Sequence, residues 1–214
     1  MRRSSLVSTR LVVGVFLVLG AFASGWISML PVLDYSVAHD LIPARFAGTV
    51  QNGPWSTRLD LARSSTPMTV RAYVAQIGLA ANQAEEAIYW NALTDSAGRP
   101  LVGSHSYEVL FKTRPPVAET GFWSLTVYDA ASFLVANPEK RYSIGDRSPL
   151  EKRADGSFTI LVSHRRASER IEDWLACPPD GPFSLTLRMY VPLPKALVEP
   201  TAISMPQVTC LDCG

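Results

Sequence analysis

Charged side chains are scarce in this sequence, and neither sign is in excess. Asp, Glu, Lys and Arg make up 18% of the 214 residues, and 20 basic residues stand against 19 acidic ones, for a net charge of +1. Without a surplus of positive charge to neutralise phosphates, the chain is not expected to bind nucleic acid. The hydrophobic fraction of 47% excludes disorder of the whole chain, because burial of so many apolar residues can offset the entropy lost on ordering. Because the apolar fraction is so high, we expect some hydrophobic residues to serve a role other than the core of a soluble domain.

Recognised catalytic motifs are also missing. The sequence contains no G-x-S-x-G, S-x-x-K, P-loop or G-x-G-x-x-G pattern. Its three histidines, His39, His105 and His164, share no spacing that would place two of them on one face of a helix or strand. Neighbouring carboxylates such as Glu85 and Glu86 would point to opposite sides of a strand, so they do not form an acid and base pair. We therefore predict no catalytic residue, no metal site and no cofactor, and whether the protein is an enzyme stays open.

One segment carries no charged side chain at all. Residues 11–33 are uncharged, Arg2, Arg3 and Arg10 precede them, and the next charge is Asp34. At about 1.5 Å per residue, the first twenty or so residues of the segment form a helix of about 30 Å, the thickness of a hydrocarbon core. The basic flank predicts that the N-terminus stays in the cytoplasm and that the C-terminal domain is exported. We expect a single-pass protein of the bacterial inner membrane whose domain faces the periplasm.

A cleaved signal peptide is the alternative for this segment. Residues 11–20 have the length of a signal-peptide hydrophobic region, and Ala21-Phe22-Ala23 offers an A-x-A cleavage site. The apolar run continues past that site to Leu33, and Trp26 lies where an interfacial aromatic would sit. We therefore favour an uncleaved anchor, and the alternative is a periplasmic or secreted protein. Without residues 1–33, which hold three Arg and no acid, 17 basic and 19 acidic side chains remain, so the exported surface is mildly acidic.

The rest of the chain divides into a lead-in, a domain and a tail. Residues 34–65 contain Pro and Gly without a sustained period, which indicates a linker or extended lead-in. At Thr66-Pro67 an N-cap and a helix-starting proline predict a short helix. The apolar residues expected on its buried face recur at helical spacing: Val70, Tyr73, Val74, Ile77 and Ala81. We expect a domain over residues 66–196 and a C-terminal tail over residues 197–214.

Beyond this helix the apolar residues recur at every second position, as in strands with one buried face. Five segments show this alternation: residues 86–93, 106–112, 122–129, 157–164 and 182–191. Turn residues separate them, including Asp95-Ser-Ala-Gly98 and Asp155-Gly156. Strands do not alternate with helices, so a parallel sheet is not expected. The pattern predicts a mainly β fold, an antiparallel β-sandwich or jelly roll with one short amphipathic helix.

Several blocks of the domain resemble a known family. These blocks, in chain order, are Phe122-Trp-Ser-Leu-Thr-Val-Tyr-Asp129, Phe133-Leu-Val-Ala-Asn137-Pro138, Arg141-Tyr-Ser-Ile-Gly-Asp-Arg147, Ala154-Asp-Gly-Ser157 and Trp174-Leu-Ala-Cys-Pro-Pro-Asp-Gly-Pro-Phe183, which leads into Leu185-Thr-Leu-Arg188-Met-Tyr190. Their order and spacing resemble the domain of unknown function 1214. The chain is similar to the small, membrane-anchored bacterial members that lack the preceding domain of unknown function 1254. The resemblance implies a β-sandwich or jelly-roll fold and no catalytic mechanism.

Polar and aromatic side chains collect on the strands and loops of this domain. We predict a ligand-binding rim from nine of them: Trp123, Tyr128, Asp129, Asn137, Arg141, Tyr142, Asp146, His164 and Arg188. In this interpretation Arg141 or Arg188 grips a carboxylate or phosphate through two N–H groups, and the aromatic rings form a stacking wall. The structural alternative is that Asp and Asn hold turns and that the arginines satisfy loop carbonyls.

A disulfide is the expected state of the cysteines in an exported protein. Cys210-Leu-Asp-Cys213 forms a C-x-x-C pair near the C-terminus, and Cys177 is the third cysteine. No helix follows the pair to lower a thiolate pKa, so thioredoxin-like redox activity is not expected. A zinc site would need a second pair of ligands, which the sequence pattern does not provide. The disulfide joins either the two tail cysteines or Cys177 and one of them.

Three functions fit these features. The first is a membrane-tethered sandwich that binds a small polar ligand, a glycan or an envelope protein on its loop rim. The second is an exported enzyme built on Asp129, Asp146, His164 and the two arginines, which requires His164 within hydrogen-bond reach of a carboxylate. The third is a structural accessory protein that docks into a larger assembly through its tail and helix face.

Overall fold

The computed structural model describes residues 48–63, 65–66, 71, 74–75, 81–166 and 172–213. The chain divides into two compact units, residues 1–45 and 46–214, and all described residues belong to the second. The expected anchor at residues 1–33 and most of the helix expected from Thr66 lie outside the described residues. Within the described part, no helix is both long and apolar enough to cross a membrane.

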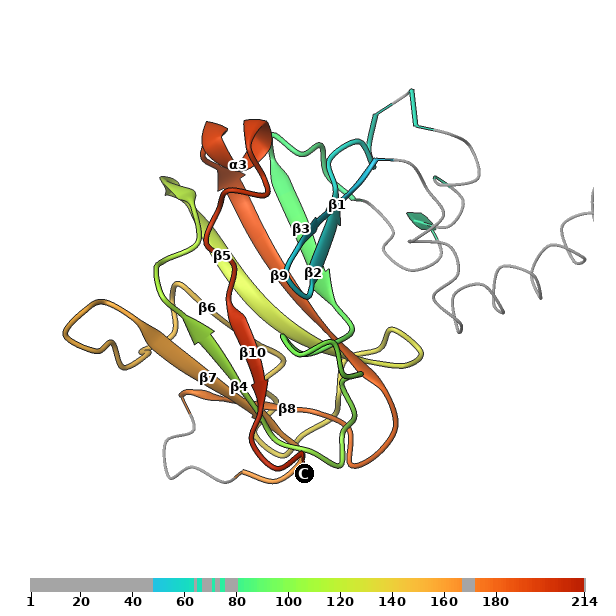
Figure 1. The fold of residues 1–214 in the computed structure, drawn as a ribbon, viewed down its shortest axis with the longest axis vertical. Helices are drawn as coiled ribbons and strands as arrows, with labels where there is room; N and C mark the ends of the chain where they lie inside the picture. The colour runs from blue at the N-terminus through green and yellow to red at the C-terminus, as the bar shows by residue number, and fades with distance from the viewer. Residues whose placement is uncertain are drawn as a thin grey trace, which may run out of the picture. The chain divides into compact units, whose positions relative to one another are not determined.

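The second unit is mainly β, as the alternating sequence pattern predicts. In chain order the described elements are β1 (Thr49–Asn52), β2 (Trp55–Arg58), β3 (Ala87–Ala92), β4 (Tyr107–Phe111), β5 (Val117–Asp129), β6 (Ser143–Gly145), β7 (Phe158–Ser163), β8 (Trp174–Ala176), β9 (Phe183–Pro192), α3 (Pro194–Val198) and β10 (Gln207–Cys210). One sheet has six strands in the order β1-β2-β3-β9-β5-β6, and the other has four in the order β10-β4-β7-β8. Figure 1 shows β9 between β3 and β5, and β4 between β7 and β10.

The longest strands, β5 and β9, pair antiparallel at the centre of the larger sheet. Their register places Leu125 opposite Leu187, and both side chains are fully buried. Successive residues of a strand point to opposite faces, so Thr126 and Arg188 lie on the outward side. A slip of one residue would turn the buried leucines toward solvent, so the alternation of apolar residues specifies this register.

A glycine permits a close approach where the β5 and β9 register shifts. The shift lies between Val117 and Phe122, and it includes Gly121. A Cβ on Gly121 would lie 2.3 Å from the backbone oxygen of Tyr190. Any larger side chain would therefore push the two strands apart at this point.

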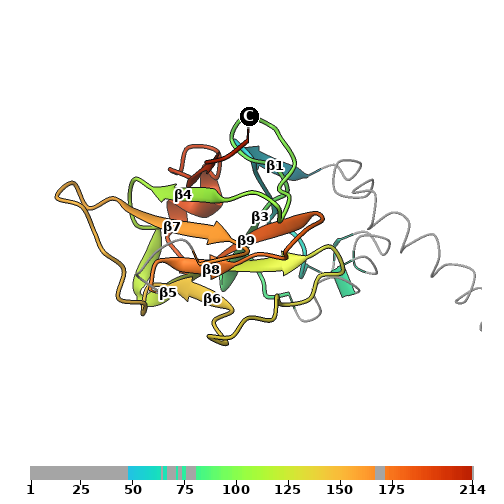
Figure 2. The same cartoon turned by 90° about the horizontal axis from the view of Figure 1, so that it is seen from below.

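The two sheets pack face to face around one hydrophobic core. The ring of Phe111 in β4 lies 5.0 Å from that of Trp123 in β5, and Phe158 in β7 lies 5.5 Å from the same tryptophan, centre to centre. All three side chains are at most 2% exposed. Burial of each stabilises the fold by about 1.5–3 kcal/mol before the entropy of ordering is subtracted. This packing is consistent with the expected β-sandwich, and Figure 2 shows β4, β7 and β8 side by side in the smaller sheet.

The five segments with alternating apolar residues all form strands, namely β3, β4, β5, β7 and β9. The shorter strands are not expected from the sequence. β1 and β2 form a hairpin inside the expected lead-in of residues 34–65, with Gly53 of the turn at φ +60°. β10 pairs with β4 inside the expected tail of residues 197–214. These strands have four residues each, too few to show a sustained alternation.

One strand pair departs from the expected antiparallel arrangement. β7 and β8 run parallel, with Leu161 opposite Trp174. The indole Nε1 of Trp174 donates a hydrogen bond of 2.9 Å to Ser163 Oγ, which ties the short strand to its neighbour. The expectation rests on the absence of strands that alternate with helices, the usual sign of a parallel pair joined by a crossover of a dozen or more residues. The connection between β7 and β8 is shorter than that, so it gives no such sign.

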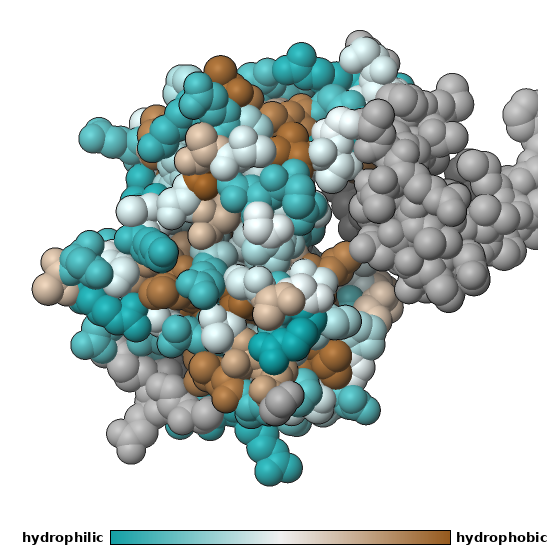
Figure 3. All heavy atoms as spheres, in the orientation of Figure 1, coloured by the Kyte–Doolittle hydropathy of each residue, from teal (hydrophilic) through white to brown (hydrophobic). Residues whose placement is uncertain are grey.

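Apolar residues of the described domain serve mainly its interior. Hydrophilic and intermediate residues cover most of the coloured surface in Figure 3, and the hydrophobic areas on it are small. Val198 and Phe133 are the most exposed large apolar side chains among the described residues. Val198 ends α3, and Phe133 lies with the exposed Leu134 in the connection between β5 and β6.

Candidate functional site

Trp123, one of the nine residues of the predicted rim, belongs to the core. Its side chain is 2% exposed and stacks against Phe158 of the opposite sheet. The physical reason is its position on the inward side of β5, two residues before the fully buried Leu125. The ring therefore offers no surface to an external ligand, and the expected stacking wall does not include it.

Asp129 and Asn137 hold turns in the connection after β5. Asp129 Oδ1 accepts hydrogen bonds from the backbone N–H groups of Ala131 at 2.9 Å and Phe133 at 2.8 Å. The Asn137 side chain donates to the backbone oxygen of Arg141 and accepts from the N–H of the same residue, both at 2.9 Å. These bonds satisfy backbone groups of the loop, as the structural alternative for these residues expects.

Arg141 and Asp146 also have local partners. Arg141 Nη1 donates to the backbone oxygen of Glu172 at 2.9 Å. Asp146 accepts two hydrogen bonds from the guanidinium of Arg114, at 3.0 and 2.6 Å. This two-point ion pair raises the pKa of Arg114. Tyr142 is 38% exposed.

His164 directly follows β7 and is exposed. In the described part of the chain, no hydrogen bond joins it to Asp129 or Asp146, and both of these carboxylates bind other groups. The exported-enzyme alternative requires His164 beside one of these carboxylates in a pocket. That arrangement is not present among the described residues.

Arg188 and Tyr128 do come together, on the outward face of the larger sheet. Arg188 Nη2 donates to the Tyr128 hydroxyl at 2.6 Å, and Nη1 donates to Thr126 Oγ1 at 3.0 Å. The register places Arg188 opposite Tyr89 of β3 on one side and Ser124 of β5 on the other. The Arg188 guanidinium therefore bonds two side chains of β5, and Tyr89 of β3 occupies the neighbouring register position on its other side.

A ring pair and a polar pair flank this arginine along the strands. Phe122 and Tyr190 stack with their ring centres 4.3 Å apart. In the other direction, Thr186 Oγ1 donates to Asn91 Oδ1 at 2.8 Å. Burial raises the pKa of Tyr190 and outweighs the opposing effect of the positive charge on Arg188. We name the outward set the Arg188 face, and its members are Asn91, Phe122, Thr126, Tyr128, Thr186, Arg188 and Tyr190.

Most of the Arg188 face is absent from the predicted rim. Phe122, Thr126, Thr186 and Tyr190 occupy outward positions of β5 and β9 and could be found by taking every second residue of the two alternating segments. Asn91 lies on β3, which is far from β9 in the sequence and adjacent to it in the sheet. Sequence alternation identifies the outward positions, and strand order decides which of them are neighbours.

A cleft lies between the turn that joins β4 to β5 and the segment around α3. Its volume is about 340 Å³, and it is lined by Thr113, Arg114, Pro116, Lys195, Glu199, Ala202, Ile203 and Ser204. Arg114 is already paired with Asp146. Lys195 and Glu199 are exposed and carry opposite charges, so the cleft does not favour a ligand of one charge.

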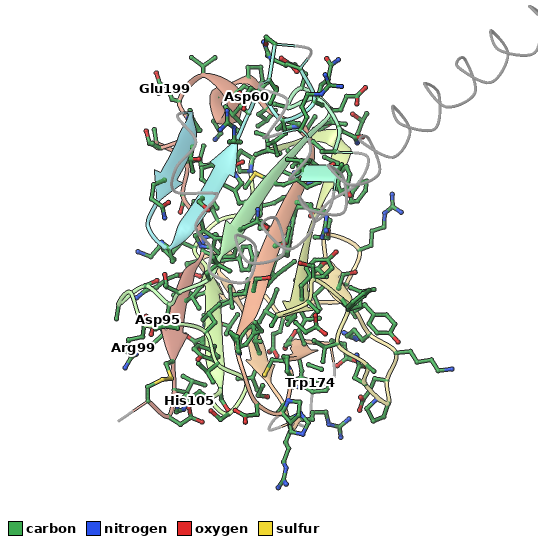
Figure 4. All side chains as sticks on the ribbon, turned by 90° about the vertical axis from the view of Figure 1, so that its right-hand side faces the viewer. Asp60, Asp95, Arg99, His105, Trp174 and Glu199 are labelled. Atoms are coloured by element: carbon green, nitrogen blue, oxygen red, sulfur yellow. A yellow bond between two sulfur atoms is a disulfide. The ribbon has the colours of Figure 1, made fainter. Side chains whose placement is uncertain are left out.

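The C-terminal segment carries a disulfide between Cys210 and Cys213. This is the pairing within the tail, one of the two left open by the sequence. Asp212 accepts a hydrogen bond from the backbone N–H of Ser106 at 3.0 Å, and His105 Nδ1 lies 3.2 Å from Asp212 Oδ1. Figure 4 shows His105 and the disulfide at the same end of the domain. The β4 and β10 pairing therefore brings residues about a hundred positions apart into contact.

Cys177 is the remaining thiol. It is buried and unpaired with another cysteine, and its sulfur lies 3.6 Å from the backbone oxygen of Gly103. Burial raises the pKa of the thiol to about 12. A neutral, buried thiol is a poor nucleophile, so Cys177 is a core residue rather than a reactive one.

Comparison with known proteins links the domain to a family without an assigned activity. The family model described as "Protein of unknown function (DUF1214)" matches residues 86–194. The VPA0106 protein from Vibrio parahaemolyticus has 28% sequence identity and a TM-score of 0.55, over 69% of this chain and 36% of that chain. An uncharacterized protein from Burkholderia cenocepacia has 21% identity and a TM-score of 0.38, over 65% of this chain and 32% of that chain. The chain thus spans well under half the length of these two proteins, and no curated protein matches it.

Proposed function

The chain belongs to the DUF1214 family of unknown function, and from this premise we propose that it is an exported binding module whose Arg188 face holds an acidic glycan. Residues 1–33 tether the module to the membrane in this proposal. The charge-free segment after three arginines supports the tether. The observation that carries the binding function is the placement of a half-buried Arg188 among tyrosine and threonine side chains on the outward face of the larger sheet.

Arg188 is held in place yet keeps capacity to bind. Of its five guanidinium N–H groups, one donates to Thr126 and one to Tyr128. The other three have no hydrogen-bond partner among the residues that the structure describes. Because two neighbours restrict the side chain, little further rotamer entropy is lost when it grips a ligand. A carboxylate suits this donor set, since it can accept two parallel hydrogen bonds from one arginine.

The surroundings of Arg188 match the rest of a sugar acid. Tyr128 and Tyr190 present partly exposed rings, and the apolar face of a sugar ring can pack on such rings. Asn91 is exposed and supplies an amide for sugar hydroxyls, while the buried Thr126 and Thr186 hold Arg188 and Asn91 in place. Among the described residues, the partly exposed side chains of this face run along β5 and β9 from Phe122 and Tyr190 to Tyr128, so an extended ligand lying along the strands can contact several of them.

General attraction between opposite charges does not explain binding here. The exported part carries 17 basic and 19 acidic residues, so it does not attract polyanions as a whole. Recognition of an acidic chain would therefore depend on the local guanidinium. This makes a single substitution an informative test.

The test measures binding of oligogalacturonate and of a neutral cello-oligosaccharide to the full chain in detergent by calorimetry. We expect the acidic oligosaccharide to bind and the neutral one to bind at least tenfold more weakly. Arg188→Ala and Arg188→Lys should each weaken binding of the acid at least tenfold, because lysine cannot form the two-point contact. Arg153→Ala is the matched control, since Arg153 bonds Thr159 in another sheet. Equal binding by the wild type and Arg188→Ala, or no binding of the acid by the folded wild type, would overturn the proposal.

A further inference from the structure

We propose that His105, Cys210, Asp212 and Cys213 form a zinc site that becomes available when the Cys210–Cys213 disulfide is reduced. One ligand atom from each of the four residues lies within 4.8 Å of the others. Two thiolates, an imidazole and a carboxylate are ligand types that Zn²⁺ prefers, and four is its usual coordination number. This inference goes beyond the proposed glycan binding and uses none of its residues.

The distances among these ligands suit a tetrahedral ion. Zinc bonds of about 2.0–2.3 Å give ligand-to-ligand separations of about 3.3–3.8 Å in a tetrahedron. His105 Nδ1 lies 3.2 Å from Asp212 Oδ1, and Cys210 Sγ lies 3.6 Å from the same oxygen. The two sulfur atoms are bonded to each other, so they must separate before an ion can bind between them. Small side-chain rotations would complete the site once that bond is broken.

Strand pairing brings His105 to the C-x-x-C segment, which already contains Asp212. In the β4 and β10 ladder, Cys210 lies opposite Tyr107. The backbone N–H of Leu211 then donates to the oxygen of Ser106 at 2.8 Å. The N–H of Ser106 in turn donates to the Asp212 carboxylate. These bonds hold the C-x-x-C segment beside His105 without help from the disulfide, so reduction need not dissolve the site.

The cluster is open to solvent. The side chains of His105 and Asp212 are 39% and 48% exposed. Leu211, between the two cysteines, is 55% exposed. Cys210 is the more buried of the two cysteines and Cys213 is partly exposed, so a reductant can reach the disulfide at Cys213, and an ion can enter past His105 and Asp212 without unfolding of the domain. By contrast, Cys177 is buried and takes no part.

The chemistry has two balanced steps. A dithiol reductant breaks the S–S bond by thiol–disulfide exchange: it passes two electrons and two protons to Cys210 and Cys213, and it becomes a disulfide itself. Zn²⁺ then displaces the two thiol protons, which leave to solvent, and bonds both sulfur atoms, His105 and Asp212. A disulfide oxidant would reverse the first step by thiol–disulfide exchange: it takes two electrons from the two thiolates and two protons from solvent, becomes a dithiol, and leaves the S–S bond reformed and the ion released. Zinc occupancy would thus report the thiol state of the compartment.

The experiment uses the full chain, reduced with dithiothreitol and desalted without oxygen. Titration with Zn²⁺ should show one tightly bound ion per reduced chain and none per oxidised chain. Co²⁺ in place of Zn²⁺ should give the visible absorption of a tetrahedral site with thiolate ligands. His105→Ala and Asp212→Asn should each weaken Zn²⁺ binding about tenfold or more. His164→Ala and Cys177→Ser are matched controls that should leave it unchanged.

Two results would overturn the proposal. One is equal Zn²⁺ affinity in reduced wild type, His105→Ala and Asp212→Asn, which would mean that the two thiols bind zinc without the other residues. The other is no tetrahedral Co²⁺ spectrum in reduced wild type. Because the Co²⁺ spectrum is recorded on the unsubstituted chain, this second result does not depend on whether a variant folds.

Discussion

Replacing Asp95 by Asn tests how much a buried carboxylate in a turn contributes to the free energy of unfolding. The Asp95 side chain is 1% exposed, in the turn after β3. Its Oδ1 accepts hydrogen bonds from the backbone N–H groups of Ala97 and Arg99, both at 2.9 Å, and its Oδ2 accepts from Arg99 Nε at 2.8 Å. Asn keeps one acceptor oxygen and turns an NH₂ group toward the guanidinium. Two donors then face each other where a charged pair stood.

The expected loss follows from these bonds. A hydrogen bond to a charged group contributes about 1.5–3 kcal/mol, and Asp95 makes such bonds to both side chain and backbone. Desolvation of the buried carboxylate offsets part of this stabilisation in the wild type. The Asp95→Asn variant does not bear this cost, which reduces the expected loss of stability. We therefore expect Asp95→Asn to lower the free energy of unfolding by about 2–3 kcal/mol at pH 7. Urea unfolding followed by tryptophan fluorescence measures it.

The same variant predicts a pH dependence. Burial alone would raise the pKa of Asp95, but the hydrogen bonds from Arg99 and Ala97 outweigh it and hold the pKa below its ordinary value. Stability from this group is therefore fully present above the unfolded pKa of about 3.9, and it is lost as the pH falls through the lower folded pKa. The difference between wild type and Asp95→Asn should be constant from pH 6 to pH 7 and should shrink in acid, roughly below pH 4.

Asp155→Asn is the matched control, because Asp155 also lies in a turn and accepts a backbone hydrogen bond from Ser157. Its side chain is exposed, so we expect a clearly smaller change in stability. The reasoning would be refuted if Asp95→Asn and Asp155→Asn lowered stability equally at pH 7. A difference between wild type and Asp95→Asn that persisted unchanged into acid would refute the pKa assignment.

The remaining predictions concern the core, the buried thiol and the N-terminus. Trp123→Ala should destabilise the domain by about 3–5 kcal/mol and Trp123→Phe by less, since the ring fills the contact between the sheets; a loss under about 1 kcal/mol in urea unfolding would contradict its assignment to the core. Cys177 should resist iodoacetamide in the native protein and react only in denaturant, and rapid alkylation detected by mass spectrometry would exclude its burial. The full chain should stay in the membrane pellet after alkaline carbonate washing and should retain Met1–Ala23 by mass spectrometry, whereas a soluble chain that begins after Ala23 would show a cleaved signal peptide.

The hydrophobic periodicity predicts the long strands because every second side chain of such a strand faces the core. In β9, Leu185, Leu187 and Met189 face the core, and the intervening residues face outward. A ten-residue strand displays this pattern several times. β8 has three residues, all of them buried, so it has no alternation to detect. Short strands depend on pairing with other strands for stability, and a partner can be distant in the sequence, as β4 is from β10.

The candidate sites show the same division. Tyr128 and Arg188 stand out in the sequence by residue type, but Asn91 joins them only through the pairing of β3 with β9. Asp129 and Asn137 stand out equally, and the structure uses them to hold turns. Residue type therefore names the side chains capable of binding, and it does not distinguish a ligand contact from a backbone contact.

By itself the sequence determined the mainly β fold, the family and the five long strands, because these depend on local alternation and on blocks of neighbouring residues. Tertiary structure alone decided which outward side chains meet and that Trp123 is enclosed. It also decided that His105 meets Cys210, Asp212 and Cys213, because β10 adds to the edge of the smaller sheet beside β4. Strand order is set by the packing of two whole sheets around one core, and no local pattern encodes it.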